Sequence, residues 1–248
     1  MPEFDTIATH YSATASMAIR KALMQTMLHV IGDVTGKAVL DLACGSGMYT
    51  RLLKQQGAGK VVGVDISHEM LALAKEEESL VPLGIEYRHG DATSLGGIGQ
   101  FDLVTASFLL HYAPDQEQLL KMLQTIRANL RPGGHFVTAN LNVRLTEVEL
   151  SRDLAKYGFA LRPAASPLMD GTPVAVTLYL EHGPIEFETY YLSKAVYDRA
   201  FTAAGFEAAN WDHPWRFAFL GNASLGRDYW DDFRARPVIS VIDCRLKT

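Results

Sequence analysis

Between residues 39 and 140, short apolar runs alternate with longer segments of helical periodicity. Several of these runs are continuously apolar, as expected for strands that are covered by helices on both faces. Repeated strand–helix–strand units form right-handed crossovers, so the sequence predicts an α/β protein with a doubly wound, mostly parallel sheet. The expected strands are residues 38–42, 60–64, 84–88, 101–106 and 134–139, and the expected helices are residues 49–56, 69–79 and 116–130.

The sequence on either side of this core has a different pattern. The expected flanking elements are helices at 16–31, 145–157 and 194–204, a loop at 162–173, a hairpin of strands at 174–180 and 185–191, and strands at 206–211 and 238–246. The last strands are expected to complete a seven-stranded Rossmann-like sheet. We therefore expect an N-terminal helical cap, a core, an inserted β-hairpin lobe and a C-terminal helix with strands, at residues 1–36, 37–142, 143–192 and 193–248.

The composition argues against several classes of protein. Asp and Glu outnumber Lys and Arg by 28 to 23 without any basic run, which argues against a nucleic-acid-binding surface. No apolar stretch approaches the roughly 20 residues that cross a bilayer, and residues 1–11 do not resemble a secretory signal. Only Cys44 and Cys244 are present, and none of the eight histidines has metal-ligand spacing. We therefore expect a cytoplasmic protein with no metal, membrane or nucleic-acid partner.

A buried strand leads into a glycine-rich turn at residues 43–47 and then into a helix. Gly45 and Gly47 allow the backbone to approach a ligand closely, and a helix N-terminus can bind a carboxylate or phosphate. The dinucleotide-binding fingerprint would place a third glycine at position 50, where this chain has Thr50. Asp41 lies inside the strand, and its carboxylate suits an ammonium group better than a pyrophosphate. The turn therefore predicts an amino-acid ligand, with a purely structural turn as the alternative.

Two further acids follow neighbouring strands, at the edge where open α/β sheets bind their ligands. Asp65 can accept two hydrogen bonds from a ribose diol, and Asp91 can accept one from an adenine amino group. The backbone N–H of Ala92 can donate to the purine ring, and Ile66 and Met70 can cover its faces. Each acid alone could instead cap a helix or face solvent. With the acid of the first strand, they predict a site for a nucleoside joined to an amino acid.

These segments together resemble the class I S-adenosylmethionine-dependent methyltransferases, in their small-molecule branch. The resemblance covers residues 37–142 and is carried by Asp41-Leu42-Ala43-Cys44-Gly45-Ser46-Gly47, Val64-Asp65-Ile66-Ser67, Gly90-Asp91-Ala92, Phe101-Asp102-Leu103-Val104 and Leu130-Arg131-Pro132-Gly133-Gly134. Residues 31–34 and their flanks are similar to bacterial natural-product N-methyltransferases, including the toxoflavin-pathway type. The resemblance implies that the core binds S-adenosyl-L-methionine, in part through the turn that contains Ala43, Gly45 and Gly47.

The resemblance also implies roles for residues outside the glycine turn. Tyr11 occupies the place of an aromatic residue that closes over the methionine moiety, and Arg20 that of an arginine that binds the cofactor carboxylate. Ser107, with the residues up to Leu110, would border the methionine amine and the methyl group. From the residues alone, Tyr11 could serve only packing and Arg20 could face solvent, so both alternatives stay open.

His111 and Tyr112 follow the fourth strand, whose end points at the methyl group in the resembled fold. A base is needed only if the acceptor is a protonated amine or a weakly acidic hydroxyl, and an imidazole has a suitable pKa. His111 is therefore the candidate base, and a histidine packed against the next helix is the alternative. Many rings in the later sequence predict a flat acceptor, or instead a core or dimer contact. They are Tyr190, Tyr191, Trp211, His213, Trp215, Phe217, Phe219, Tyr229 and Trp230.

The sequence thus predicts transfer of a methyl group to nitrogen or oxygen of a small, aromatic or heteroaromatic molecule. Two other functions are compatible with parts of the pattern. A nicotinamide-dependent oxidoreductase would share Gly45, Gly47 and Asp65 but would leave Asp41 and Asp91 unexplained. A non-catalytic cofactor-binding protein would keep the site without turnover. The open edge of the hairpin favours a homodimer or a lid.

Overall fold

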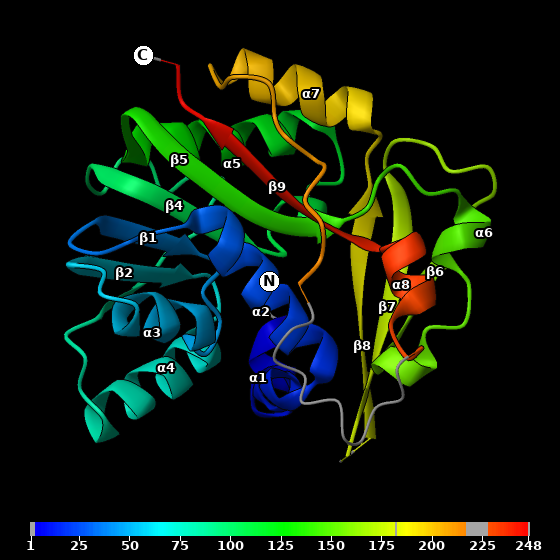
Figure 1. Ribbon diagram of the computed structural model, residues 1–248, viewed down its shortest axis with the longest axis horizontal. Helices are drawn as coiled ribbons and strands as arrows, with labels where there is room; N and C mark the ends of the chain where they lie inside the picture. Colours follow the sequence, from blue (N-terminus) through cyan, green and yellow to red (C-terminus); the bar gives the residue numbers. More distant parts are fainter. Residues whose placement is uncertain (1–2, 182, 217–227, 248) are drawn as a thin grey trace.

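Two β-sheets lie side by side in the protein, and the N-terminal helices lie between them (Figure 1). The computed structural model describes residues 3–181, 183–216 and 228–247. The larger sheet and its helices form the core, and the smaller sheet forms a lobe beside it.

The larger sheet has five strands from the first part of the chain and one from its C-terminal part. They are β1 (Ala38–Leu42), β2 (Lys60–Asp65), β3 (Glu86–His89), β4 (Phe101–Ser107), β5 (Leu130–Leu141) and β9 (Ile239–Arg245). The strand order is β3-β2-β1-β4-β5-β9, and all neighbours are parallel except β9, which is antiparallel to β5. The chain reverses its direction across the sheet between β1 and β4, so the carboxyl ends of these two strands flank a crevice.

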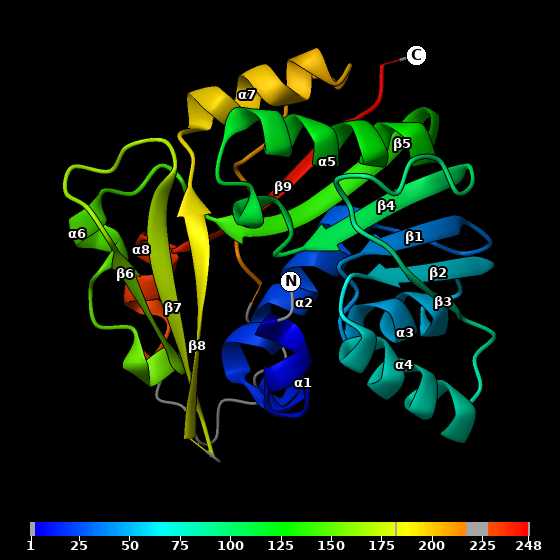
Figure 2. The same ribbon diagram turned by 180° about the vertical axis from the view of Figure 1, so that it is seen from behind.

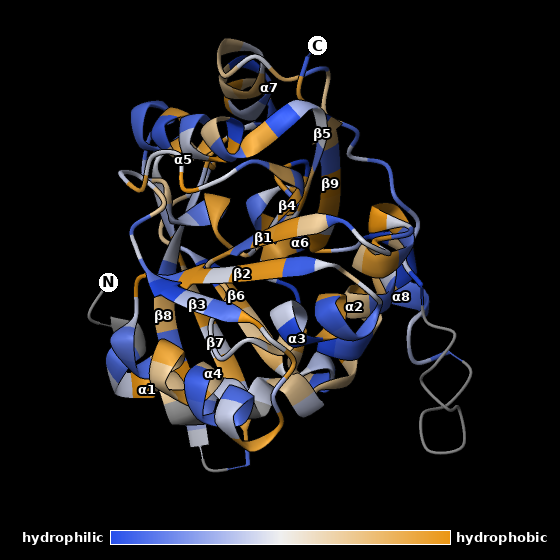
Figure 3. Cartoon of the chain, turned by 90° about the vertical axis from the view of Figure 1, so that its left-hand side faces the viewer, coloured by the Kyte–Doolittle hydropathy of each residue, from blue (hydrophilic) through white to orange (hydrophobic). Residues whose placement is uncertain are grey.

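Helices cover both faces of this sheet. They are α2 (Ala18–Ile31), α3 (Met48–Gln55), α4 (His68–Leu80), α5 (Gln116–Asn129) and α7 (Lys194–Ala203), whereas α1 (Glu3–Ser12) packs beside α4. Figure 3 shows the apolar strands between one layer of α5 and α7 and a second layer with α2, α3 and α4. The side chains of β1 alternate between these layers, because Val39 packs with the α2 and α3 cluster and Leu40 with the α5 and α7 cluster.

The helix α1 spans the gap between the core and the lobe (Figure 2). At one end, Asp5 accepts a hydrogen bond of 2.6 Å from the hydroxyl of Ser67. Ser67 is also the N-cap of α4, where its oxygen accepts a hydrogen bond from the Met70 N–H at 3.1 Å. At the other end, the Tyr11 ring lies edge-on to the ring of Phe187 in the lobe, with centroids 6.2 Å apart. The helix is therefore fixed to both parts of the molecule.

The lobe is a three-stranded antiparallel sheet of β6 (Phe159–Pro163), β7 (Thr172–Leu180) and β8 (Gly183–Tyr191). One of its faces is apolar and buried. Val174, Val176 and Phe187 point to this face, and Val176 is paired with Phe187 in the register of β7 and β8. These side chains belong to the same hydrophobic cluster as α2, so the lobe and the core share a continuous interior.

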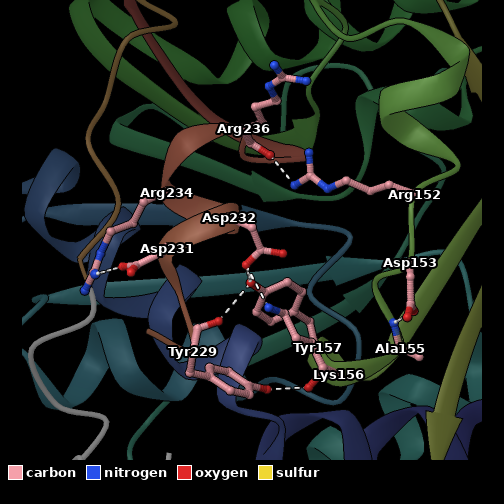
Figure 4. Close-up of polar contacts among 10 residues, drawn as sticks. All are labelled: Arg152, Asp153, Ala155, Lys156, Tyr157, Tyr229, Asp231, Asp232, Arg234 and Arg236. Carbon is pink, nitrogen blue, oxygen red and sulfur yellow. Dashed lines mark hydrogen bonds and ion pairs between the residues drawn. The ribbon is translucent and has the colours of Figure 1, made fainter. Parts of the chain in front are cut away.

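The C-terminal part of the chain anchors the lobe through α8 (Asp231–Ala235) and the turn η3 (Ala155–Tyr157) (Figure 4). The Tyr157 hydroxyl is within hydrogen-bond distance of the Asp232 carboxylate and of the Tyr229 carbonyl oxygen, and Lys156 Nζ is 2.8 Å from the same carboxylate. The Tyr157 ring stacks on Trp230 with centroids 5.2 Å apart. Burial and the Asp232 carboxylate raise the pKa of Tyr157 to about 12, so its hydroxyl stays protonated at neutral pH.

The fold class predicted from the sequence is confirmed, but several elements differ. The described part of the larger sheet has six strands rather than seven, because residues 206–211 meet β9 and its extension only through isolated bridges at Phe206 and Asn210. The predicted helix at 145–157 is also wrong. It is broken into α6 (Glu147–Leu150) and η3, because the Asp153 side chain accepts a hydrogen bond from the Ala155 N–H and starts a new turn.

The predicted loop at 162–173 begins inside β6, and α1 and α8 were not expected. β6 is short, and its strand character becomes evident only through its pairing with β7. No helix in the described ranges has both the length and the apolar character that crossing a membrane requires. Cys44 and Cys244 are free and buried. The same ranges contain no group of three or more His, Cys, Asp or Glu residues that could hold a metal ion.

Candidate functional site

A cavity of about 340 Å³ opens at the carboxyl ends of β1, β2, β3 and β4. It lies beside the point where the strand order reverses, which is where open α/β sheets bind ligands. We call it the first cavity. Its lining residues are Tyr11, Leu42, Ala43, Gly45, Val64, Asp65, Ile66, Met70, Gly90, Asp91, Ala92, Thr93, Ser107, Phe108, Leu109, Tyr112, Gln118, Lys121 and Met122.

The glycine turn forms one wall of the first cavity. Gly45 has a positive φ of 56°, and a Cβ atom added there would meet only the Met70 sulfur, at 3.9 Å, so the backbone faces open space. Gly47 has a positive φ of 85° and is the N-cap of α3, but a Cβ atom there would collide with the Tyr87 hydroxyl. Gly45 therefore exposes its backbone to a ligand, whereas Gly47 is required by packing.

Asp65 ends β2, and its carboxylate is fixed by the backbone on both sides. Oδ2 accepts a hydrogen bond from the Gly45 N–H at 2.7 Å, and Oδ1 accepts one from the Ser67 N–H at 2.9 Å. Burial raises the pKa of Asp65, and these backbone donors oppose the shift. Each carboxylate oxygen has further lone-pair capacity, so the group can also accept hydrogen bonds from a diol in the cavity.

Asp91 lies after β3 on the same rim. Its Oδ1 accepts hydrogen bonds from the backbone N–H and the hydroxyl of Thr93, at 2.7 and 2.8 Å. Its Oδ2 makes no hydrogen bond with any residue that the structure describes, although the residue lines the cavity. This oxygen is available to an amino group of a ligand. Ala92, which follows it, lines the same wall.

Asp41 is 2% exposed and does not line the cavity. Its oxygens accept hydrogen bonds from the hydroxyls of Thr50 and Thr105, at 2.7 and 2.8 Å. Burial raises the pKa of Asp41 to about 6, although both hydroxyl bonds favour the ionised form. The carboxylate thus joins the start of α3 to β4 beneath the glycine turn. Thr50, the departure from the dinucleotide fingerprint, is part of this connection.

A second cavity, of about 70 Å³, adjoins the first between α2, the end of β4 and the lobe. Tyr11, Phe108 and Tyr112 line both cavities and so form the wall between them. Phe108 has a positive φ of 60°, which is uncommon for a residue with a side chain and indicates local strain. The other lining residues are Met17, Ile19, Arg20, Leu23, His111, Leu141, Phe159, Leu161, Val176, Leu178, Phe187 and Ile239.

Arg20 and His111 are the residues of the second cavity that can bear a positive charge. Nη2 of Arg20 donates hydrogen bonds to the hydroxyls of Tyr11 and Thr14, at 2.5 and 3.3 Å. His111 is 4% exposed, and neither of its ring nitrogens has a hydrogen-bond partner. Burial, with a smaller contribution from Arg20, lowers the pKa of His111 to about 3, so the imidazole is neutral at neutral pH.

The structure brings most of the residues singled out from the sequence to the first cavity. Those that line it are Tyr11, Ala43, Gly45, Asp65, Ile66, Met70, Asp91, Ala92, Ser107 and Tyr112. Arg20 and His111 line the second cavity instead, and Asp41 and Gly47 line neither. No specific role was predicted for Phe159 and Phe187, because the register that places them on the inner face of the lobe is fixed only by strand pairing.

The aromatic segment was expected to supply either the wall of an acceptor site or a core or dimer contact, and the rings that the structure describes do not form the wall of either cavity. None of Tyr190, Tyr191, Trp211, His213, Trp215, Tyr229 and Trp230 lines either cavity. Trp211 packs edge-on to Tyr197 of α7, and Trp215 packs on Phe233 of α8, with centroids 5.6 and 4.7 Å apart. These rings therefore build the interior. Phe217 and Phe219 lie outside the described residues.

The chain was compared with known protein families and proteins. Residues 39–134 match a family model described as a methyltransferase domain. The chain is 38% identical over 111 residues to demethylmenaquinone methyltransferase of Lactococcus lactis, covering 43% of each chain. It is 33% identical over 116 residues to ubiquinone biosynthesis O-methyltransferase of Acinetobacter baylyi, covering 45% of this chain and 46% of the relative. The matches thus span less than half the length of these relatives.

The solved structure of an S-adenosylmethionine-dependent methyltransferase from Clostridium acetobutylicum superposes with a TM-score of 0.66 at 17% identity. The superposition covers 97% of this chain and 98% of that one, so the similarity in fold extends over the lobe as well as the core. The family match favours a methyltransferase over the nicotinamide-dependent alternative. Residues 39–134 of this chain therefore match a methyltransferase domain, and the chain as a whole has a Rossmann-like fold that is similar to that of solved methyltransferases.

Proposed function

We propose that this protein is an S-adenosylmethionine-dependent methyltransferase that acts on nitrogen or oxygen of a small molecule. The observation that carries the proposal is the first cavity, where Gly45, Asp65 and Asp91 come together from three strand ends. This cavity lies within the segment that matches the methyltransferase domain. The names of the two relatives refer to menaquinone and ubiquinone, which supports an aromatic ring in the acceptor.

The residues around the first cavity fit S-adenosylmethionine. The open backbone at Gly45 would accept the amino-acid part, and Asp65 would bind the ribose hydroxyls. The free Oδ2 of Asp91 would bind the adenine amino group, and Ile66 and Met70 would cover the purine. The ribose and the adenine amino group of the cofactor therefore each have a matching polar group, and the purine has an apolar surface.

The cofactor, when bound, supplies a methyl carbon activated by its sulfonium, which an in-line nucleophile takes while the bonding electrons stay on sulfur. The protein's own contribution is then to orient the acceptor and to exclude water, and orientation can lower the barrier by up to roughly 7–11 kcal/mol. Tyr11, Phe108 and Tyr112 border both cavities, and aromatic faces stabilise a nearby positive charge. These rings would therefore line the route between cofactor and acceptor.

The remaining roles are proposals from the sequence. The small, apolar second cavity supports a small-molecule acceptor rather than a nucleic acid. A cytoplasmic location, a toxoflavin-type acceptor and a homodimer through the open edge of the lobe stay predictions. His111 as general base also stays a prediction, and with a pKa of about 3 it could take a proton only from an acidic acceptor.

Calorimetric titration with S-adenosylhomocysteine tests the proposed function. We expect Asp65→Asn to weaken binding at least tenfold, or about 1.4 kcal/mol, because the amide offers the ribose diol one acceptor oxygen where the carboxylate offers two. Asp102→Asn is the matched control, since Asp102 lies at the opposite edge of the sheet and bonds to the Ala38 N–H and Arg131. Failure of the wild-type protein to bind, or equal affinity of the wild type and Asp65→Asn, would refute the proposal.

A further inference from the structure

We propose that the acceptor is an aromatic oxyanion, bound in the second cavity with its ionised oxygen against the Arg20 guanidinium. This inference rests on the proposed function and specifies the chemical class of its substrate. It follows from the charge of the second cavity, from two ring nitrogens without partners, and from the character of the surrounding walls.

The charge of Arg20 is not neutralised by the protein. No carboxylate forms an ion pair with Arg20 among the residues whose side chains the structure describes. The guanidinium carbon lies 5.1 Å from the centroid of the Tyr11 ring and 5.0 Å from that of the Phe108 ring. These rings and two neutral hydroxyls are weak substitutes for an anion, and a partly buried cation without a counter-charge is costly. An anion in the second cavity would supply the counter-charge that Arg20 lacks.

Arg20 is placed to serve the second cavity rather than the first. It lines the second cavity and is absent from the wall of the first, which Gly45, Asp65 and Asp91 help to form. The sequence resemblance implied that Arg20 binds the cofactor carboxylate. This geometry instead favours a role for Arg20 in binding the acceptor. The positive charge of Arg20 therefore lies in the second cavity, on the side of the shared aromatic wall where we place the acceptor.

His111 supplies the second observation. Both of its ring nitrogens are buried without a partner, and a buried polar atom that is left unpaired is energetically costly. The ring stacks on Phe108 with centroids 5.7 Å apart and lies edge-on to Tyr112 at 4.8 Å, so its position is fixed. A neutral imidazole can donate one hydrogen bond to a ligand oxygen without adding a second positive charge. An acceptor that arrives ionised also has no proton to lose, which removes the need for a strong base.

The residues that line the second cavity indicate what the ligand carries besides its ionised oxygen. None of its lining residues is an acid, and apart from Arg20 and His111 they are aromatic or aliphatic. Tyr11, Phe108, Tyr112, Phe159 and Phe187 surround the space with rings, which favour a flat apolar body. A single arginine in such surroundings discriminates strongly for an anion, because its charge is weakly screened by water.

Matched pairs of ligands test this proposal in the full chain saturated with S-adenosylhomocysteine. The pairs are 4-nitrophenolate and 4-nitroanisole, benzoate and benzamide, and 1-naphthoate and 1-naphthamide. We expect at least one anion to bind ten times more tightly than its neutral partner by calorimetry. At a pH near the pKa of 4-nitrophenol, binding to the protein should also increase the absorbance of its phenolate form relative to the free compound. Arg20→Met should abolish the preference, and Arg20→Lys should retain part of it.

Lys21→Met is the matched control, since Lys21 is an exposed cation next to Arg20 on α2 and lines neither cavity, and it should leave the preference unchanged. Leu178→Phe provides a test that keeps the arginine, because the larger ring should occupy the second cavity and block the anions while S-adenosylhomocysteine still binds. The proposal is overturned if no pair favours the anion or if the preference survives Arg20→Met. It is also overturned if Arg20→Met weakens S-adenosylhomocysteine tenfold, which would assign Arg20 to the cofactor. A wild-type protein that binds no S-adenosylhomocysteine would instead refute the proposed function.

Discussion

The contrast between Asp41 and Asp65 shows what a single residue reveals from its position in the sequence. Asp65 could be assigned to the cavity because it ends a strand whose neighbours end at the same edge of the sheet. Asp41 ends up beneath the cavity because two threonine hydroxyls bind it there. One of these, Thr105, lies 64 residues away in the sequence and meets Asp41 only in the assembled sheet. Such a contact cannot be predicted from the residues next to Asp41 in the sequence.

The buried Asp41 predicts a stability change that depends on pH. Its pKa of about 6 in the folded protein lies above the value near 3.9 of an unfolded aspartate, so ionisation between these values disfavours folding. Asp41→Asn should therefore raise the free energy of unfolding by on the order of 2–3 kcal/mol above pH 6. The gain should shrink as the pH falls and disappear below about pH 4, where Asp41 is protonated in both states. Urea unfolding of both proteins at pH 4 and pH 8 measures the difference, and an equal gain at both values would contradict the explanation.

Gly47 and Tyr87 connect the glycine turn to β3, and their contact yields a prediction about an element. Gly47→Ala adds a Cβ atom at a positive φ and against the Tyr87 hydroxyl, so we expect it to destabilise the protein by at least about 1–2 kcal/mol. Tyr87→Phe removes the hydroxyl and should recover part of this loss, though not the part that is due to φ. Thermal unfolding of the single and double variants gives the coupling. Strictly additive effects would show that the ring does not press on the turn.

The elements of the core were predictable and those of the lobe were less so, for a physical reason. The core strands are continuously apolar and are separated by helices with clear ends, so their local pattern matches their environment. In the lobe, β6 owes its extended form to pairing with β7, and the helix expected at 145–157 is interrupted at Asp153 by a side-chain hydrogen bond. Tertiary pairing and side-chain caps of this kind override periodicity.

The anchor of the lobe on α8 gives a second prediction about elements. Tyr157→Phe keeps the ring contacts but removes the hydroxyl, which can donate its one proton to Asp232 or to the Tyr229 carbonyl. We expect a loss of about 1–2 kcal/mol in the free energy of unfolding, as for a part-buried hydrogen bond to a charged group. Tyr179→Phe, at an exposed tyrosine of β7, is the control and should change little. If both variants unfold at the same urea concentration, the anchor contributes nothing measurable.

Across the whole molecule, α1 connects the core to the lobe and covers the first cavity through Tyr11. A ligand in that cavity would add contacts to Tyr11, so S-adenosylhomocysteine should slow amide hydrogen exchange in residues 5–12. The helix α7 packs on the opposite face of the sheet from the second layer of helices and should be unaffected. Mass spectrometry of exchange with and without the ligand checks this. Uniform protection of both helices would indicate global stabilisation rather than closure by α1.

The two cavities share an aromatic wall, but different stretches of chain build their remaining sides. The segment that matches the methyltransferase domain ends at residue 134, whereas Phe159, Val176 and Phe187 of the second cavity come later. On the proposed function, substitutions in the lobe therefore change which acceptor is recognised while the first cavity keeps its shape. Because different stretches of chain build the two cavities, the lobe could be exchanged to alter substrate specificity without changing the first cavity.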